Sequence, residues 1–250
     1  MTSKVNGGWY SHRLDQFVNV VRYGHAGQPV LLFPTAGGDA EESERFRMMV
    51  VLGPLLDAGL IRVYTCDSVS GRAWIDGELP AREKPIVQNR FDAFVYREFV
   101  PAIRTDCREA NVEIVAAGSS IGAFNALAIL LRHPDVFKSA VCMSGTYDFS
   151  RFMQGTETPE YHEASPMHFF PTLPDDSETL RRLRTRFVLL ATGEGRFEAP
   201  QESWAVGQML GGRGVPNRVD FWGKERQHDW NTWRAMLPDY LGRLTREGRL

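Results

Sequence analysis

Short apolar runs alternate with longer segments of helical periodicity along most of the chain. The runs are rich in Val, Ile, Leu and Phe, and they predict buried strands at 30–33, 61–66, 112–117, 136–143, 186–191 and 218–222. The longer segments repeat their apolar residues at helical spacing and predict helices over 41–56, 88–107, 124–131, 200–210 and 230–244. Strands that alternate with helices predict a mostly parallel sheet flanked by helices, which is the α/β class.

Three segments depart from this alternation. Residues 14–23 alternate apolar and polar positions and end at Gly24, which predicts an early antiparallel strand. Residues 71–84 and 149–178 are rich in Pro, Gly, Asp and aromatic residues and predict loops or short helices over the sheet. The segment 149–178 lies between two predicted strands, where a cap over an active site can be inserted; the alternative is a flexible surface insertion. Within 88–107, Pro101 must kink the helix or begin a second one.

Length, composition and charge limit the domain number, the partners and the location that we expect for this protein. With 250 residues and 43% hydrophobic content, the chain predicts a single domain, 1–250, around one substantial core. Its 29 basic and 31 acidic residues give a formal charge of −2, which favours a small neutral or mixed substrate over nucleic acid or an anionic membrane. No apolar run approaches the ~18 residues of a membrane span and no export signal is evident, so we expect a cytoplasmic protein. The sequence does not define an oligomeric state.

The pentapeptide Gly118-Ser119-Ser120-Ile121-Gly122 is the most informative motif, because it stands between a predicted strand and a predicted helix. A G-x-S-x-G nucleophile elbow at such a corner needs small flanking residues, so that the central serine presents its hydroxyl at the carboxyl end of the sheet. Ser120 is therefore the candidate nucleophile. Ser119 is its rival, but it lies one place before the centre, where its side chain would point away from a substrate. The alternative for the motif is an ordinary Gly-Ser turn.

A serine nucleophile needs a base within hydrogen-bond reach, and the base needs an orienting acid. Only His228, among the histidines that follow Ser120, lies after the last predicted strand and before the last predicted helix, where the chain order Ser, acid, His requires it. The others lie at a helix end or within 149–178, namely His133, His162 and His168. The acid is open among three carboxylates: Glu194 and Glu198 after one late strand, and Asp148 after the strand before it.

An oxyanion hole needs two backbone N–H groups, one from the residue after the nucleophile and one from the loop after an early strand. Ile121 supplies the first, and Ala36, in the run Pro34-Thr35-Ala36-Gly37-Gly38, is the candidate for the second. That run is otherwise a plain loop or a phosphate cradle, yet it matches neither nucleotide-binding glycine pattern. Three scattered cysteines, Cys66, Cys107 and Cys142, lack metal-site spacing and resemble small core residues. We expect neither a cofactor nor a metal.

With these motifs the chain resembles the esterase D-like branch of the α/β-hydrolase superfamily, which includes S-formylglutathione hydrolases, feruloyl esterases and mycolyltransferases. The resemblance runs from about Val30 to Leu241 and rests on the serine motif, on 31–35, 66–68, 132–134 and 143–145, and on 219–223 with 228–230. It implies the α/β-hydrolase fold and acyl chemistry. The relatives' late loop reads approximately G-x-G-x-aromatic-acid, so the resemblance assigns the acid to Glu198. The loop at Ala36 lacks the His-Gly pair of many esterases, which weakens any inference about the substrate.

Three functions are compatible with these residues. The first is a serine carboxylester hydrolase, in which a Ser120-His228-Glu198 triad acts on a small-molecule ester through an acyl-enzyme. The second is an acyltransferase that passes the same acyl group to an alcohol or amine. The third is a catalytically silent binding protein on the same scaffold. The presence of all three triad residue types in the required order favours an enzyme, and the esterase explains the most features.

Overall fold

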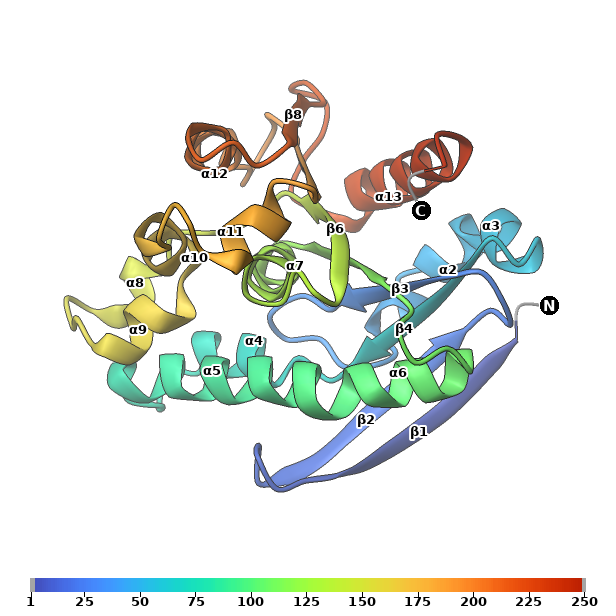
Figure 1. The fold of residues 1–250 in the computed structure, drawn as a ribbon, viewed down its shortest axis with the longest axis horizontal. Helices are drawn as coiled ribbons and strands as arrows, with labels where there is room; N and C mark the ends of the chain where they lie inside the picture. The colour runs from blue at the N-terminus through green and yellow to red at the C-terminus, as the bar shows by residue number, and fades with distance from the viewer. Residues whose placement is uncertain (1–2, 249–250) are drawn as a thin grey trace.

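An eight-stranded sheet forms the centre of residues 3–248, the part of the chain that this computed structural model describes (Figure 1). Its spatial order is β1-β2-β4-β3-β5-β6-β7-β8. The strands are β1 (Lys4–Ser11), β2 (Gln16–Tyr23), β3 (Gln28–Phe33), β4 (Ile61–Cys66), β5 (Ile114–Ser119), β6 (Phe137–Met143), β7 (Phe187–Thr192) and β8 (Asn217–Phe221).

The sheet is antiparallel on one side only. β1 and β2 form a hairpin and β2 runs antiparallel to β4, whereas all other neighbours are parallel. The loops that follow β3 and β5 to β8 therefore meet at one edge of the sheet, where ligands bind in parallel α/β sheets. Central strands such as β5 are buried on both faces, which is why they appear in the sequence as continuous apolar runs.

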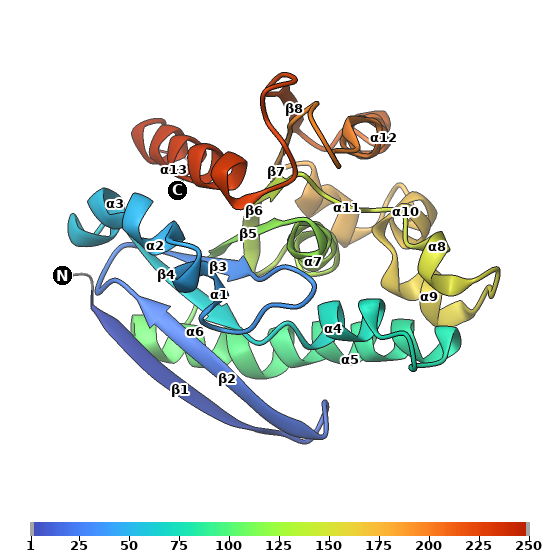
Figure 2. The same ribbon diagram turned by 180° about the vertical axis from the view of Figure 1, so that it is seen from behind.

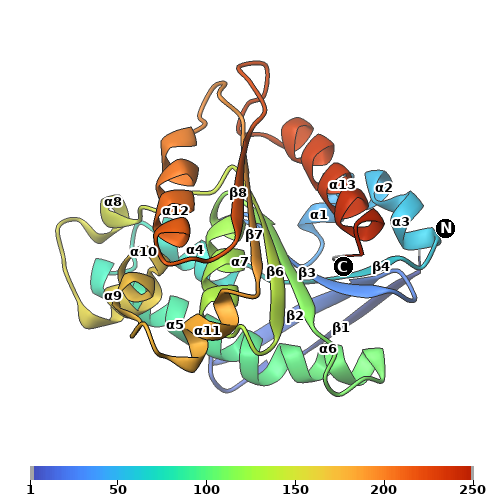
Figure 3. The ribbon, with the colours of Figure 1, turned by 45° about the horizontal axis from the view of Figure 1, so that its top comes forward.

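Helices cover both faces of this sheet (Figure 3). One face carries α1 (Glu42–Arg45), α2 (Met48–Val51), α3 (Gly53–Asp57) and α13 (Trp230–Arg246). On the other side lie α4 (Val69–Ile75), η1 (Ala81–Glu83), α5 (Lys84–Phe94), η2 (Val95–Phe99), α6 (Val100–Cys107), α7 (Ile121–Arg132), α8 (Ser150–Met153), α9 (Pro159–Ala164), α10 (Pro166–Phe169), η3 (Phe170–Thr172), α11 (Glu178–Leu183) and α12 (Pro200–Gly212). Each side buries its own apolar core against the sheet.

The helix predicted over 41–56 is wrong in detail, because the structure divides this segment into α1, α2 and α3. Arg47 adopts a left-handed conformation with a φ of 63°, which interrupts the first helix. Pro54 lies in the first turn of α3, where its missing N–H costs no hydrogen bond. Apolar periodicity therefore predicted which side of this segment is buried, but not where the helix is interrupted.

The helix predicted over 88–107 runs from α5 into α6 through a π-helical turn, η2. Pro101 lies in the first turn of α6, directly after this wider turn, so the turn accommodates the proline where a regular helix would clash with it. The result is one long, continuous helical segment along the hairpin side of the sheet (Figure 1).

The segment between β6 and β7 consists of short helices beside α4 and α5 (Figure 2). Aromatic contacts hold it there: the Trp74 ring lies 4.7 Å from that of Phe149 and 6.3 Å from that of Tyr161. These contacts pack the segment against α4. Within residues 3–248, no helix combines the length and the apolar character that a bilayer span requires.

Candidate active site

Ser120 occupies a strained corner between β5 and α7. Its φ of 58° and ψ of −124° lie in a region that side chains other than glycine seldom adopt, at a cost of about 1–3 kcal/mol. The Ser120 N–H donates to the Met143 carbonyl at 3.0 Å, which ties the corner to β6. Ser120 is partly exposed, whereas Ser119 belongs to β5 and is only 4% exposed.

The two glycines of the motif are required by close backbone approach. A Cβ on Gly118 would lie 2.2 Å from the Gly122 carbonyl oxygen. A Cβ on Gly122 would lie 2.6 Å from the carbonyl oxygen of Phe33 and 2.8 Å from that of Pro34. The start of α7 therefore rests directly on the loop after β3, which carries Ala36.

We expect Gly122→Ala to shift this loop and to reduce both stability and activity. The added methyl meets backbone atoms that cannot rotate away, and overpacking of this kind costs about 1–3 kcal/mol. Gly53→Ala is the matched control, because nothing lies within 4 Å of its Cβ position. Thermal unfolding and ester hydrolysis of both variants test the expectation, and unchanged melting and activity in Gly122→Ala would contradict it.

The loops after β7 and β8 are joined through their backbones. The Gly195 N–H donates to the Arg226 carbonyl at 2.9 Å, and the His228 N–H donates to the Arg196 carbonyl at 3.1 Å. A Cβ on Gly193 would lie 2.2 Å from the Arg226 oxygen, so this approach requires glycine. The pairing brings a carboxylate of the first loop to a histidine of the second.

That carboxylate is Glu198, whose side chain is 1% exposed. Its Oε2 lies 3.8 Å from Nδ1 of His228, an ion-pair distance longer than a hydrogen bond. Glu198 also accepts a hydrogen bond from the Ser144 hydroxyl at 2.7 Å, and the Thr192 hydroxyl lies 3.2 Å from Oε2. Two neighbours therefore fix the carboxylate while one oxygen faces the imidazole.

Two residues that sequence reasoning missed complete this network. Trp233 donates from Nε1 to Ser144 Oγ at 3.0 Å, and its ring lies edge-on to His228 with centroids 5.1 Å apart. Ser144 has a φ of 46°, a second strained residue at the same edge of the sheet. The signals were present in the sequence: Ser144 directly follows a buried strand, and Trp233 lies one helical turn after the loop that holds His228.

The other candidate carboxylates lie apart from His228. Glu194 is exposed in the same loop as Glu198. Asp148 accepts a hydrogen bond from the Ser150 N–H at 2.9 Å, and its hydrogen bonds with Ser150 hold the pKa of the carboxyl below its usual range. Of the three carboxylates considered from the sequence, only Glu198 faces the His228 ring.

The remaining histidines make structural contacts of their own. His133 lies 2.9 Å from an Asp92 oxygen, at the end of α7. His162 lies 2.7 Å from a Glu157 oxygen and stacks on His168, with ring centroids 4.8 Å apart. Neither arrangement places a histidine ring against Glu198.

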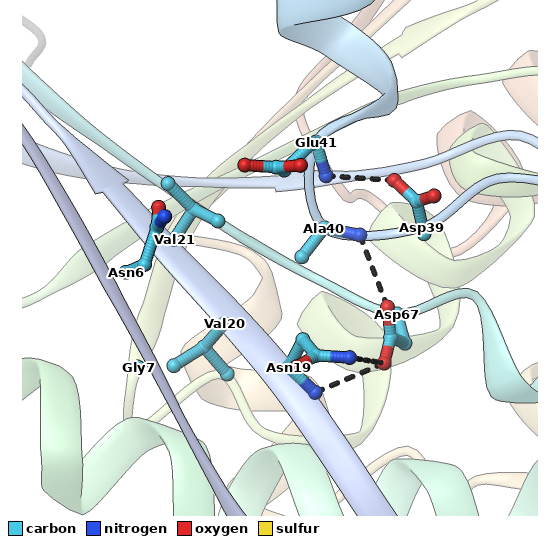
Figure 4. A pocket seen from close by; sticks show the side chains of 9 residues that line it. All are labelled: Asn6, Gly7, Asn19, Val20, Val21, Asp39, Ala40, Glu41 and Asp67. Carbon is cyan, nitrogen blue, oxygen red and sulfur yellow. Dashed lines mark hydrogen bonds between the residues drawn. The ribbon is translucent and has the colours of Figure 1, made fainter.

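Ala36 lies in a loop that buried carboxylates hold at two points. Glu42, only 6% exposed, accepts hydrogen bonds from both the N–H and the hydroxyl of Thr35, and burial raises the pKa of this carboxyl. Asp67 accepts from the Ala40 N–H at 3.2 Å and from the backbone and side chain of Asn19 at 2.9 Å (Figure 4). These contacts hold the loop in place, and the Ala36 N–H has no hydrogen-bond partner among the described residues.

A comparison with protein families finds that residues 70–244 match the family described as "Putative esterase". The chain belongs to this esterase family. It is a serine esterase with the α/β-hydrolase fold, as the sequence resemblance implied. No curated protein matches the sequence.

Solved structures similar to this esterase share the fold at low identity. A ferulic acid esterase aligns with a TM-score of 0.74 and 18% identity, over 98% of this chain and 99% of the other. An S-formylglutathione hydrolase from Agrobacterium tumefaciens aligns with a TM-score of 0.71 and 13% identity, over 98% and 95%. FphF, a fluorophosphonate-binding serine hydrolase of Staphylococcus aureus, aligns with a TM-score of 0.67 and 13% identity, over 98% of each chain.

Proposed function

We propose that the esterase hydrolyses carboxylic esters through an acyl-enzyme on Ser120. The Ser120 oxygen attacks the ester carbonyl carbon while His228 takes the hydroxyl proton, and the resulting oxyanion accepts hydrogen bonds from the N–H groups of Ile121 and Ala36. Collapse of this intermediate expels the alcohol, which receives the proton from His228. Water then repeats the sequence, releases the acid and restores the serine.

Glu198 orients the imidazole in this scheme and stabilises the imidazolium that forms. The observation that carries the proposal is the convergence at one sheet edge of the strained Ser120 corner and a buried carboxylate 3.8 Å from the His228 ring. Catalytic hydrogen bonds are often long before substrate binds, so this distance fits the role. We further propose a single domain in which the short helices over 149–178 act as a cap.

Labelling with a fluorophosphonate tests the proposed nucleophile. The serine oxygen displaces fluoride from phosphorus, and the adduct is stable enough to locate by peptide mass spectrometry. We expect one adduct, on the peptide that contains Ser120, and loss of esterase activity in proportion to labelling. Product analysis with and without added alcohols tests the acceptor: free acid as the only acyl product marks a hydrolase, and a new ester marks a transferase.

We expect Glu198→Gln to lower kcat on the order of 10²-fold or more, because a neutral amide cannot stabilise the imidazolium. Melting should change little, since the amide oxygen can still accept from Ser144 and the amide N–H can donate to Thr192. Steady-state hydrolysis of a short neutral ester measures the effect.

Glu194→Gln is the matched control for this prediction. It removes the same charge from the same loop, but from an exposed side chain. We also expect Asp148→Asn to cost less than Glu198→Gln. A greater loss in either of these variants would assign the acid elsewhere without disturbing the pairing of Ser120 with His228.

A further inference from the structure

The strand β8 forms an open edge of the sheet. It is the last strand in the spatial order, it lies between α12 and α13, and no strand of residues 3–248 pairs with its outer side (Figures 1 and 2). None of its residues is buried, whereas every residue of the central strand β5 is. An open edge is a template for pairing with another strand, so proteins usually block it.

The backbone groups on the outer side of β8 follow from its hydrogen bonds with β7. At one end of the strand the Val188 N–H donates to the Pro216 carbonyl at 3.1 Å. At the other end the Trp222 N–H donates to the Thr192 carbonyl at 2.9 Å. Because the direction of these groups alternates along a strand, even-numbered residues of β8 face β7 and odd-numbered residues face outward. The outward residues are Asn217, Val219 and Phe221.

Of the features that usually block a strand edge, β8 has only charge. Its pairing with β7 is regular from end to end, without a bulge, and the strand contains neither proline nor lysine. Its two charged residues, Arg218 and Asp220, have opposite signs. The other edge of the sheet differs, because the single charge of β1 belongs to Lys4, which pairs with Glu41 and Glu44.

The order of these two charges makes the β8 edge complementary to itself. Arg218 and Asp220 share the face of the sheet that α13 covers: their side chains form an ion pair at 2.6 Å, and the Tyr240 hydroxyl of α13 donates to Asp220 at 3.0 Å. If two β8 strands pair antiparallel about a centre at Val219, Arg218 of each copy lies directly opposite Asp220 of the other. Opposite charges at facing positions stabilise such a pair.

The same centre uses all of the outward backbone groups. Val219 then faces Val219 of the second copy, and Asn217 faces Phe221. Facing residues whose backbone groups point toward each other exchange two hydrogen bonds, so each outward N–H and carbonyl gains a partner. A centre at Arg218 or Asp220 would pair fewer of these groups, and it would place a charge opposite its own copy.

Apolar surface lies beside this edge, on the face opposite the charges. Trp204 of α12 and Phe221 are 51% and 46% exposed, and their ring centroids are 6.2 Å apart. Val219 belongs to the same face, because its side chain packs at Gly207 of α12. The two-fold axis of an antiparallel pair is perpendicular to the sheet, so α12 of both copies lies on one face of the joined sheet and α13 of both on the other (Figure 3).

We propose that the esterase forms a two-fold symmetric homodimer in which β8 pairs antiparallel with β8 of a second copy, centred on Val219. One continuous sheet then runs through both copies, and a closed dimer leaves neither β8 edge open to further chains. Arg218 and Asp220 are outside the proposed catalytic triad, so the assembly can be tested separately from the proposed reaction.

Sedimentation velocity at micromolar concentration tests the proposal. We expect the wild type to sediment as a particle of twice the 28.3 kDa chain mass. Arg218→Asp and Asp220→Arg should each raise the dimer Kd on the order of 10²-fold or more, because both facing pairs become like-charged. Arg181→Asp is the matched control: it makes the same charge change on an exposed side chain of α11 and should stay dimeric.

Mixing the two charge variants tests the register of the pairing. A dimer of one Arg218→Asp copy and one Asp220→Arg copy has opposite charges at both facing positions. The mixture should therefore sediment as a heterodimer, although each variant alone is monomeric. The chain that carries both substitutions should again form a homodimer, because its facing charges are exchanged and still opposite.

Val219→Pro tests the backbone pairing and does not depend on the charge variants. It removes an N–H that faces outward and no hydrogen bond to β7, so the chain should fold, as thermal unfolding would report, but remain monomeric. A monomeric wild type would overturn the proposal. A dimer that survives both Val219→Pro and Arg218→Asp would do the same, because the contact would then lie on another surface, such as β1. Folded charge variants that stay monomeric when mixed would overturn the register.

Discussion

Ser120→Ala should abolish the hydrolysis of short activated esters and the reaction with fluorophosphonates. The substitution removes the attacking oxygen, and loss of a catalytic nucleophile lowers kcat on the order of 10⁴-fold or more. The fold should persist, because the strained backbone at Ser120 is held by its hydrogen bond to Met143 and by the packing of α7, to which the hydroxyl does not contribute. Ester hydrolysis, probe labelling and thermal unfolding of one preparation measure all three expectations.

Ser119→Ala is the control built into the motif. It deletes the same hydroxyl group one residue earlier, from a side chain that is 4% exposed within β5. We expect this variant to retain most of its activity and to label at Ser120. If Ser119→Ala were inactive while Ser120→Ala kept its activity, the nucleophile would be Ser119.

The buried half of the fold was predictable from the sequence. β3 to β8 were predicted within a few residues of their observed bounds. For β3 to β7 the reason is burial on both faces of the sheet, which gives continuous apolar runs, whereas β8 is an edge strand without a buried residue. The corner at Ser120 was predictable for a different reason. A strand, a serine between two glycines and an apolar helix are all local in sequence.

β1 was missed because it lies at the edge of the sheet, where most of its side chains are exposed and do not alternate between apolar and polar. Its first four residues are exposed, and Gly7 and Gly8 interrupt any apolar alternation, so the strand exists through its pairing with β2. Pairing is a property of two segments together. The pattern of one segment alone therefore does not predict strand pairing. Apolar periodicity likewise did not predict the breaks between α1, α2 and α3.

The residues of the candidate site also fall into two groups: those that local sequence indicated and those that only the tertiary structure revealed. His228 and Glu198 were proposed from their positions after late strands, with the resemblance choosing among the carboxylates. The structure places the two side chains 3.8 Å apart, and their catalytic roles stay predictions. Ser144 and Trp233 were not identified, because their roles come from tertiary contacts: one hydroxyl accepts from an indole of α13 and donates to a buried carboxylate.

His228 lies where the loop after β7 and the loop after β8 are hydrogen-bonded to each other. Its N–H is fixed to the Arg196 carbonyl, its ring lies against the edge of Trp233, and Asp229 caps α13 directly after it. These contacts fix the backbone and one side of the imidazole, so the ring is positioned before any substrate binds. Preorganisation of this kind supports the proposed role of His228 as the general base for Ser120.

His228→Ala is therefore expected to lower kcat on the order of 10³-fold or more, because Ser120 loses the group that accepts its proton. Folding should survive, since the Asp229 cap and the loop pairing depend on other atoms. Labelling by a fluorophosphonate should slow as well, and added imidazole, which fits the vacated space beside Trp233, should restore part of the rate.

His162→Ala is the matched control, because its side chain is 55% exposed and pairs with Glu157, away from the paired loops. It should hydrolyse a short neutral ester like the wild type. If His162→Ala lost as much activity as His228→Ala, the position of His228 after the last strand would no longer identify the base. Rescue by imidazole separates the two explanations for a dead His228→Ala variant: a missing proton acceptor can be replaced from solution, whereas a collapsed loop cannot.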